Sequence, residues 1–132
     1  LREATARLGE VASLSVRSIT FTDSGYALTG NSLTLTGTNG ISANQASGSN
    51  AITFPFVLGT NVTINVANSG ASLGVSGTLT FNARPLTTSG SGFCNFGLLS
   101  GAGGSFNKLG SGTNRLSGAG PNNFVGGATV DT

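Results

Sequence analysis

The stretch from Ile52 to Val66 reads ITFPFVLGTNVTINV. Ile52, Phe54, Phe56 and Leu58 occupy every second position before Gly59-Thr60-Asn61, and Val62, Ile64 and Val66 do so after it. Gly and Asn between the two runs favour a tight turn. Alternation with a period of two places one set of side chains on one face of a strand and the other set on the opposite face. The stretch therefore predicts two short β-strands joined by a turn.

The same pattern recurs on both sides of this stretch, with turn signals spaced about six to twelve residues apart. Such spacing is typical of a β-sandwich, a barrel or a solenoid. Asn and Gly punctuate the strand ends, and the outward positions are Thr, Ser and Asn, which can form polar ladders between stacked rungs. We therefore expect an all-β, parallel β-helix (β-solenoid), with a β-sandwich as the alternative. The residues expected to face the core are Leu33, Leu35, Ile52, Phe54, Val62, Ile64, Val66, Leu73, Val75 and Phe81.

Residues 1–12 follow a different pattern. Leu1, Ala4, Leu8 and Val11 fall at helical spacing, which predicts a short N-terminal helix that caps the solenoid. An ordinary linker is the alternative for this segment. Residues 13–132 are expected to form the rungs, as part of a longer chain or assembly, because the sequence ends at Thr132 within a strand pattern.

Several local features refine this prediction. Pro55 cannot donate a ladder hydrogen bond, so it is expected at an edge or bulge. Residues 45–50 are polar and predict a loop. Towards the C-terminus the pattern is richer in Gly and less regular, and the predicted strands are Phe93–Leu99, Ser105–Leu109, Asn114–Leu116 and Phe124–Val130.

The composition excludes several classes of protein. Gly, Ser, Thr and Asn make up over half of the 132 residues, while only 8% are charged and 37% are hydrophobic. Disordered chains combine low hydrophobicity with high net charge, which this chain lacks. The six Lys and Arg residues are scattered, so nucleic acid has no basic face to bind. No apolar run is long enough to span a membrane.

The inventory of reactive side chains predicts no enzyme. The acidic residues are Glu3, Glu10, Asp23 and Asp131, and no two of them share a strand face as glycoside hydrolysis would require. Cys94 is the only cysteine, and the chain has no His to act as its base or as a metal ligand. We therefore expect no catalytic residues, no cofactor-binding residues, no metal site and no cofactor.

The Gly-rich stretch of residues 99–130 contains a series of short segments, namely Ser100-Gly101, Gly103-Gly104, Lys108, Gly110, Gly112-Thr113, Leu116-Ser117-Gly118, Gly126-Gly127 and Thr129-Val130. In this order and spacing, these segments resemble one repeat of the autotransporter-associated β-strand family. The chain departs from the repeat at Asn114 and Arg115, and by extra residues before Lys108 and before Phe124. The resemblance implies a right-handed parallel β-helix that is exported to the bacterial cell surface or secreted. The family has no shared catalytic residues to transfer.

Two functions follow from this reasoning. The first is a non-catalytic structural module, namely a surface passenger, a matrix component or a fibre-forming unit whose rungs stack end to end. The alternative is an adhesin-type module that binds glycans or surfaces. Sugar binding usually uses exposed aromatic rings, and this chain has one Tyr, no Trp and eight Phe that mostly alternate inward. This pattern favours the structural role, with self-association through the solenoid ends or continuation of the same chain.

Overall fold

The computed structural model is a β-solenoid. It describes residues 4–8, 14–124 and 126–131. Within these residues the secondary structure consists of strands alone, arranged as three six-stranded sheets. The strands of every pair are parallel, so the predicted solenoid is confirmed and the β-sandwich is excluded.

The chain visits the three sheets in a fixed order. Sheet A contains β1 (Ala4–Leu8), β4 (Tyr26–Gly30), β7 (Ser47–Ile52), β10 (Gly70–Val75), β13 (Phe93–Phe96) and β16 (Thr113–Leu116). Sheet B contains β2 (Leu14–Val16), β5 (Leu33–Leu35), β8 (Phe56–Leu58), β11 (Leu79–Thr80), β14 (Leu99–Gly101) and β17 (Asn123–Phe124). Sheet C contains β3 (Ile19–Phe21), β6 (Ile41–Ala43), β9 (Val62–Val66), β12 (Leu86–Gly90), β15 (Phe106–Lys108) and β18 (Ala128–Val130).

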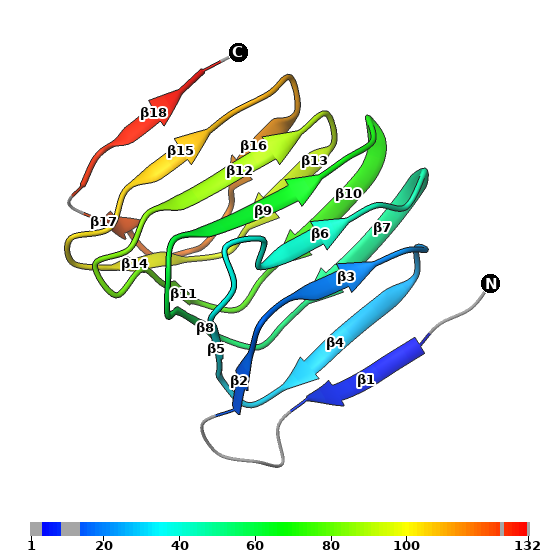
Figure 1. Cartoon of the computed structure of the whole chain (residues 1–132), viewed down its shortest axis with the longest axis horizontal. Helices are drawn as coiled ribbons and strands as arrows, with labels where there is room; N and C mark the ends of the chain where they lie inside the picture. Colours follow the sequence, from blue (N-terminus) through cyan, green and yellow to red (C-terminus); the bar gives the residue numbers. More distant parts are fainter. Residues whose placement is uncertain (1–3, 9–13, 125, 132) are drawn as a thin grey trace.

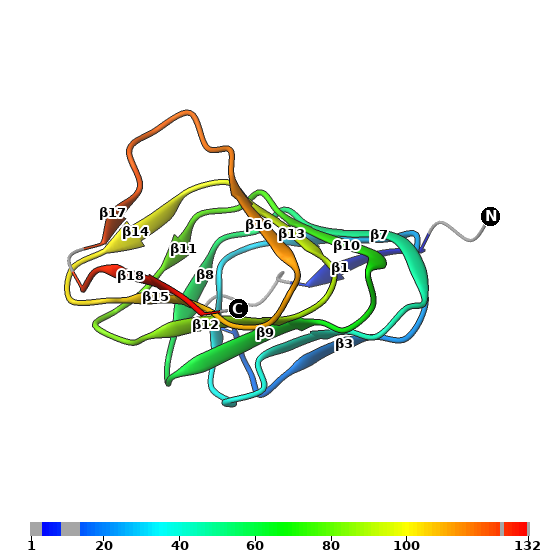
Figure 2. The same ribbon diagram turned by 90° about the horizontal axis from the view of Figure 1, so that it is seen from above.

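Three consecutive strands, one from each sheet, form a rung, and each rung lies in register on the one before it. In sheet C, for example, Ile19 pairs with Ile41, and Ile41 pairs with Ile64. Figure 1 shows the strands of one sheet side by side in sequence order from the N-terminal to the C-terminal end. Figure 2 shows the ribbon from above, with the strands of the three sheets forming the sides of the coil.

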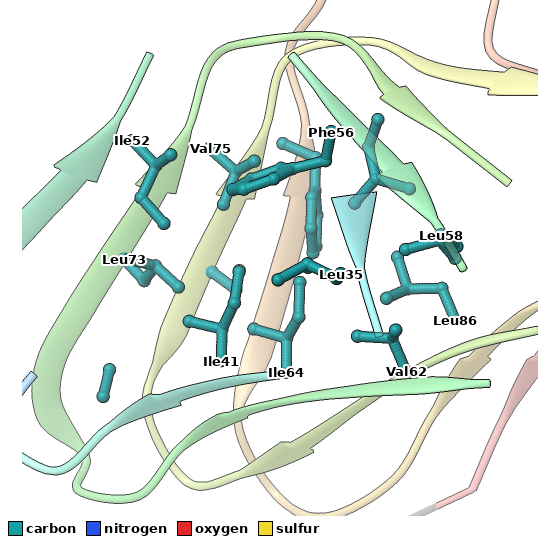
Figure 3. Packing of buried hydrophobic residues seen from close by; sticks show 14 of the residues in the cluster. Leu35, Ile41, Ile52, Phe56, Leu58, Val62, Ile64, Leu73, Val75 and Leu86 are labelled. Atoms are coloured by element: carbon teal, nitrogen blue, oxygen red, sulfur yellow. The ribbon is translucent and has the colours of Figure 1, made fainter. Parts of the chain in front are cut away.

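The core is a continuous column of apolar side chains that point inward from all three sheets (Figure 3). All ten residues predicted to face the core are buried, none with more than 2% of its surface exposed. Burial alternates along the strands, as in β9, where Val62, Ile64 and Val66 are buried while Thr63 and Asn65 are partly exposed. The alternation read from the sequence therefore gives the correct inward face.

The N-terminal helix predicted for residues 1–12 is wrong where the structure describes them. Ala4–Leu8 form β1, which pairs in parallel with β4, and the rest of that segment lies outside the described residues. An isolated helix of this length is marginal because nucleation is costly. The edge of β4 instead offers free backbone groups, and a strand in register satisfies them.

The polar loop predicted at residues 45–50 is also wrong. Ser47–Ile52 form β7, which pairs with β4 on one side and β10 on the other. Gln45 and Asn50 are buried, each with 2% of its surface exposed. Their side-chain amides form hydrogen bonds to backbone groups of neighbouring rungs. These internal bonds take the place of the water contacts that polar side chains would make in a loop.

The predicted C-terminal strands are shorter than expected because the solenoid turns corners within them. The predicted Phe93–Leu99 is divided between β13, which ends at Phe96, and β14, which starts at Leu99. Phe124–Val130 likewise becomes β17 and β18. At Gly97 a Cβ atom would lie 2.5 Å from the carbonyl oxygen of Ser76 on the preceding rung, so close stacking at this corner requires glycine.

Pro55 lies at a corner between β7 and β8, outside the strands, rather than at the edge or bulge that the sequence predicts. Its side chain is exposed, and its carbonyl accepts a hydrogen bond from the Leu33 N–H at 3.2 Å. The corner needs no donor from residue 55, so the missing N–H of proline costs nothing there.

Candidate functional site

The last rung, formed by β16, β17 and β18, exposes apolar side chains at inward positions that are mostly buried in the middle rungs. In sheet A, four inward-facing residues pair in register on successive strands: Ile52, Val75, Phe96 and Leu116. The first three are at most 1% exposed, whereas Leu116 is 42% exposed. Since all four occupy the same register position, Leu116 differs only in lacking a described rung stacked on it.

Sheet C gives the same contrast. Val130 follows Thr88 and Lys108 in register, and it is 67% exposed although Thr88 is buried. From sheet B, the half-buried ring of Phe124 lies 5.2 Å from that of Phe81 and 6.3 Å from that of Phe106. Leu116, Phe124 and Val130 together form what we call the C-terminal end surface.

Backbone groups complete this surface. The three strands of the last rung are each the outermost member of their sheet in the described part of the chain. The outer edge of a parallel strand carries N–H and C=O groups in the spacing that another strand needs. The C-terminal end surface therefore combines an apolar centre with three strand edges.

A second feature is an open groove at the corner between sheets B and C, near the N-terminal end. It has a volume of about 630 Å³ and is lined by Arg17, Ser18, Thr36, Gly37, Thr38 and Asn39, which we call the corner groove. The Thr36 hydroxyl donates to the Val16 carbonyl at 3.1 Å, which ties the second rung to the first. The side chains lining the groove are polar, and Arg17 is the charged one among them.

The core itself contains a polar pair that the sequence did not predict. Thr88 is buried, and the Asn114 side-chain amide donates to its hydroxyl. Lys108 occupies the next inward position after Thr88 in sheet C, and its ammonium group bonds to the Gly110 carbonyl near the surface. The sequence does not distinguish Thr88 and Lys108 from outward-facing polar residues, because the apolar residues that mark the inward face elsewhere are missing at these two positions.

The reactive side chains do not gather into a site in the described residues. Asp23 lies in the corner after β3 and Asp131 follows β18, at opposite ends of the rung stack, while Glu3 and Glu10 lie outside the described residues. Over the same described ranges, no three His, Cys, Asp or Glu side chains cluster in a way that could hold a metal ion. Burial raises the pKa of the Cys94 thiol from 9.0 to about 12, so this thiol stays protonated at neutral pH.

In the part of the chain that the structure describes, no helix is long and apolar enough to cross a bilayer. The chain matches no protein-family model, no curated protein and no solved structure.

Proposed function

We propose that this chain is a non-catalytic structural module that acts by extending its stack of rungs. Further β-rungs, from a second copy or from the same polypeptide, would cover the C-terminal end surface. The observation that carries this proposal is the exposure of Leu116, whose register counterparts Ile52, Val75 and Phe96 are buried, together with the exposure of Val130 at an inward position of sheet C.

The energetics favour such stacking. Burying apolar surface contributes about 25 cal/mol per Å², and pairing three strand edges would satisfy their backbone groups at the same time. Charge repulsion between copies is weak, because the 132 residues carry a net charge of only +2. A head-to-tail contact of this kind is heterologous, so repeated stacking would produce a linear fibre rather than a closed dimer.

The role that we infer is extracellular, as a surface passenger or a matrix component. The resemblance of residues 99–130 to the autotransporter-associated β-strand repeat supports this role. The repeat maps onto β14 to β18, five consecutive strands that make up nearly two three-strand rungs of the solenoid. Protease treatment of intact cells that express the full-length protein tests the location: a passenger would be digested from outside, and an internal protein would be protected.

Assembly is tested by light scattering on the purified chain over a wide concentration range, for the parent, Val130→Asp and Ser49→Asp. We expect particle mass to rise with concentration for the parent and to stay monomeric for Val130→Asp, because the new carboxylate would be buried at the junction. Ser49 is exposed in the middle of sheet A, so Ser49→Asp adds the same charge away from the end. Parent particles that remain monomeric throughout would exclude stacking of copies and leave only continuation within one chain.

The corner groove favours a second candidate, an adhesin-type module that binds glycans. Arg17 offers a charged donor to a carboxylate or sulfate group, and Thr36, Thr38 and Asn39 offer hydroxyl and amide groups to sugar hydroxyls. The ligand class would be an acidic saccharide. Binding of uronate oligosaccharides that Arg17→Ala abolishes, with no binding of neutral glucans, would support this candidate. Equal binding by the parent and Arg17→Ala would reject it.

A further inference from the structure

The corner between β5 and β6 contains Asn39-Gly40, the one place in the 132-residue sequence where Asn precedes Gly. Asn39 is exposed and lines the corner groove, whereas Gly40 is buried. Asn is a chemically labile residue, and its lability depends on the residue that follows it. This corner therefore combines a reactive side chain with a neighbour that leaves it accessible.

The reaction at such a pair is intramolecular. The backbone nitrogen of Gly40 attacks Cγ of Asn39, forming a C–N bond, while the bond from Cγ to Nδ2 breaks. Ammonia leaves with the proton from the Gly40 N–H, and a succinimide ring remains. Water then opens the ring at either carbonyl, giving aspartate or isoaspartate. A side chain on the following residue obstructs this attack, and glycine has none.

The fold keeps glycine at position 40. A Cβ atom there would lie 2.6 Å from Cγ1 of Val62, which is itself buried at 1% exposure in the next rung. The Gly40 carbonyl accepts a hydrogen bond from the Ile19 N–H at 2.8 Å. Among the hydrogen bonds of the described residues outside the strands, Gly40 takes part through this carbonyl and not through its nitrogen. Rung packing thus requires the residue that makes Asn39 labile.

We propose that Asn39 is a site of spontaneous deamidation, which replaces a neutral amide in the corner groove by a carboxylate. Arg17 lines the same groove, so the new negative charge forms in a groove that already contains a positive one. The normal aspartate product keeps the length of the main chain. The isoaspartate product adds a methylene group to the main chain just before Gly40, which the Ile19 hydrogen bond and the Val62 side chain hold in place.

The next rung provides an internal control. Asn61 is exposed at the same corner, and the Thr63 N–H donates to the Thr38 carbonyl at 2.6 Å, so the two corners stack on each other. Asn61 is followed by Val62, whose branched Cβ obstructs attack by its backbone nitrogen. Asn39 and Asn61 therefore share location and exposure and differ in the following residue.

The experiment is incubation of the folded parent chain and of Asn39→Gln at neutral and at mildly alkaline pH, followed by peptide mass spectrometry and isoelectric focusing. In the parent, we expect the peptide that contains Asn39 to gain the mass difference between an amide and an acid. Isoelectric focusing should show one more acidic band. Both changes should appear faster at the higher pH. The peptide with Asn61 and the Asn39→Gln protein stay unchanged.

Two results would overturn the proposal. The first is that Asn39 stays unmodified in the folded chain but deamidates when the chain is unfolded in urea. The fold would then protect Asn39 from the reaction. The second is equal modification of Asn39 and Asn61, since the following residue would then not decide the reaction. Asn39→Asp supplies the reference position for the acidic band.

Discussion

Oδ1 of Asn50 lies 2.9 Å from the backbone nitrogen of Tyr26, which is 24 residues earlier in the sequence and one rung below. Nδ2 of the same amide donates to the Asp23 carbonyl at 3.0 Å. One buried side chain therefore satisfies a donor and an acceptor of the backbone where the chain turns from sheet C into β4. At this corner the side chain of Asn50 forms the two hydrogen bonds that a neighbouring strand would otherwise provide.

Replacing this amide should destabilise the fold. We expect Asn50→Ala to lower the free energy of unfolding by about 2 to 4 kcal/mol, because the Tyr26 N–H and the Asp23 carbonyl lose their partners in a buried place. Urea unfolding measures the change. Asn44 is exposed, so Asn44→Ala is the matched control and should change stability by less than about 1 kcal/mol. Equal effects of the two substitutions would mean that the hydrogen bonds of Asn50 contribute nothing.

The inward register of β9 gives a second prediction. Ile64 is fully buried, with 0% of its surface exposed, so Ile64→Asp would bury a carboxylate without a partner and cost at least about 3 kcal/mol. Thr63 is adjacent and faces outward. Thr63→Asp should be tolerated within about 1 kcal/mol in the same thermal or urea unfolding experiment. A reversal of the two effects would mean that the strand faces the other way.

The predictions from sequence succeed where a residue's position follows from alternation alone. Leu33, Val62 and Leu73 lie on strands whose apolar residues all belong to one face, so the pattern fixes which side is buried. It fails at Asn50 and Gln45, because a polar residue type does not distinguish a solvated side chain from a buried one that bonds to the backbone. The residues next to Asn50 and Gln45 in the sequence do not indicate that backbone groups of another rung lie within hydrogen-bonding distance of their side chains.

The helix predicted for residues 1–12 fails for a different reason. β1 forms because β4 offers an edge, and this partner lies about 22 residues away along the chain. The exposure of Leu116 and the corner groove at Arg17 likewise depend on which rungs stack on which. Alternation identifies a face, but the presence or absence of a covering rung is a property of the assembled stack.

Cys94 gives a prediction for pH dependence. Burial raises its pKa from 9.0 to about 12, so between these two pH values the folded chain holds a proton that the unfolded chain releases. The stabilisation from the protonated thiol is complete below pH 9.0 and is lost as the pH rises towards about 12. We expect the stability of the parent chain to fall more steeply over this window than that of Cys94→Ala. Parallel pH profiles for the two proteins would contradict the buried, protonated thiol.

Gly77 and Gly74 differ in how closely the backbone of the neighbouring rung approaches them. A Cβ atom at Gly77 would lie 2.1 Å from the carbonyl oxygen of Phe54, while one at Gly74 would have its nearest neighbour, the Asn50 carbonyl oxygen, at 3.8 Å. Gly77 lies at the corner after β10 and Gly74 within β10, so the same alanine substitution probes two environments in one rung.

We expect Gly77→Ala to destabilise the chain by about 2 to 4 kcal/mol, because the backbone of two rungs must separate to admit a methyl group. Gly74→Ala should be neutral or stabilising by up to about 1 kcal/mol, since alanine reduces the conformational freedom of the unfolded chain. Denaturant midpoints for the two variants, measured with unchanged slopes, test this. A destabilised Gly74→Ala beside a stable Gly77→Ala would mean that the rungs do not approach each other most closely at the corners.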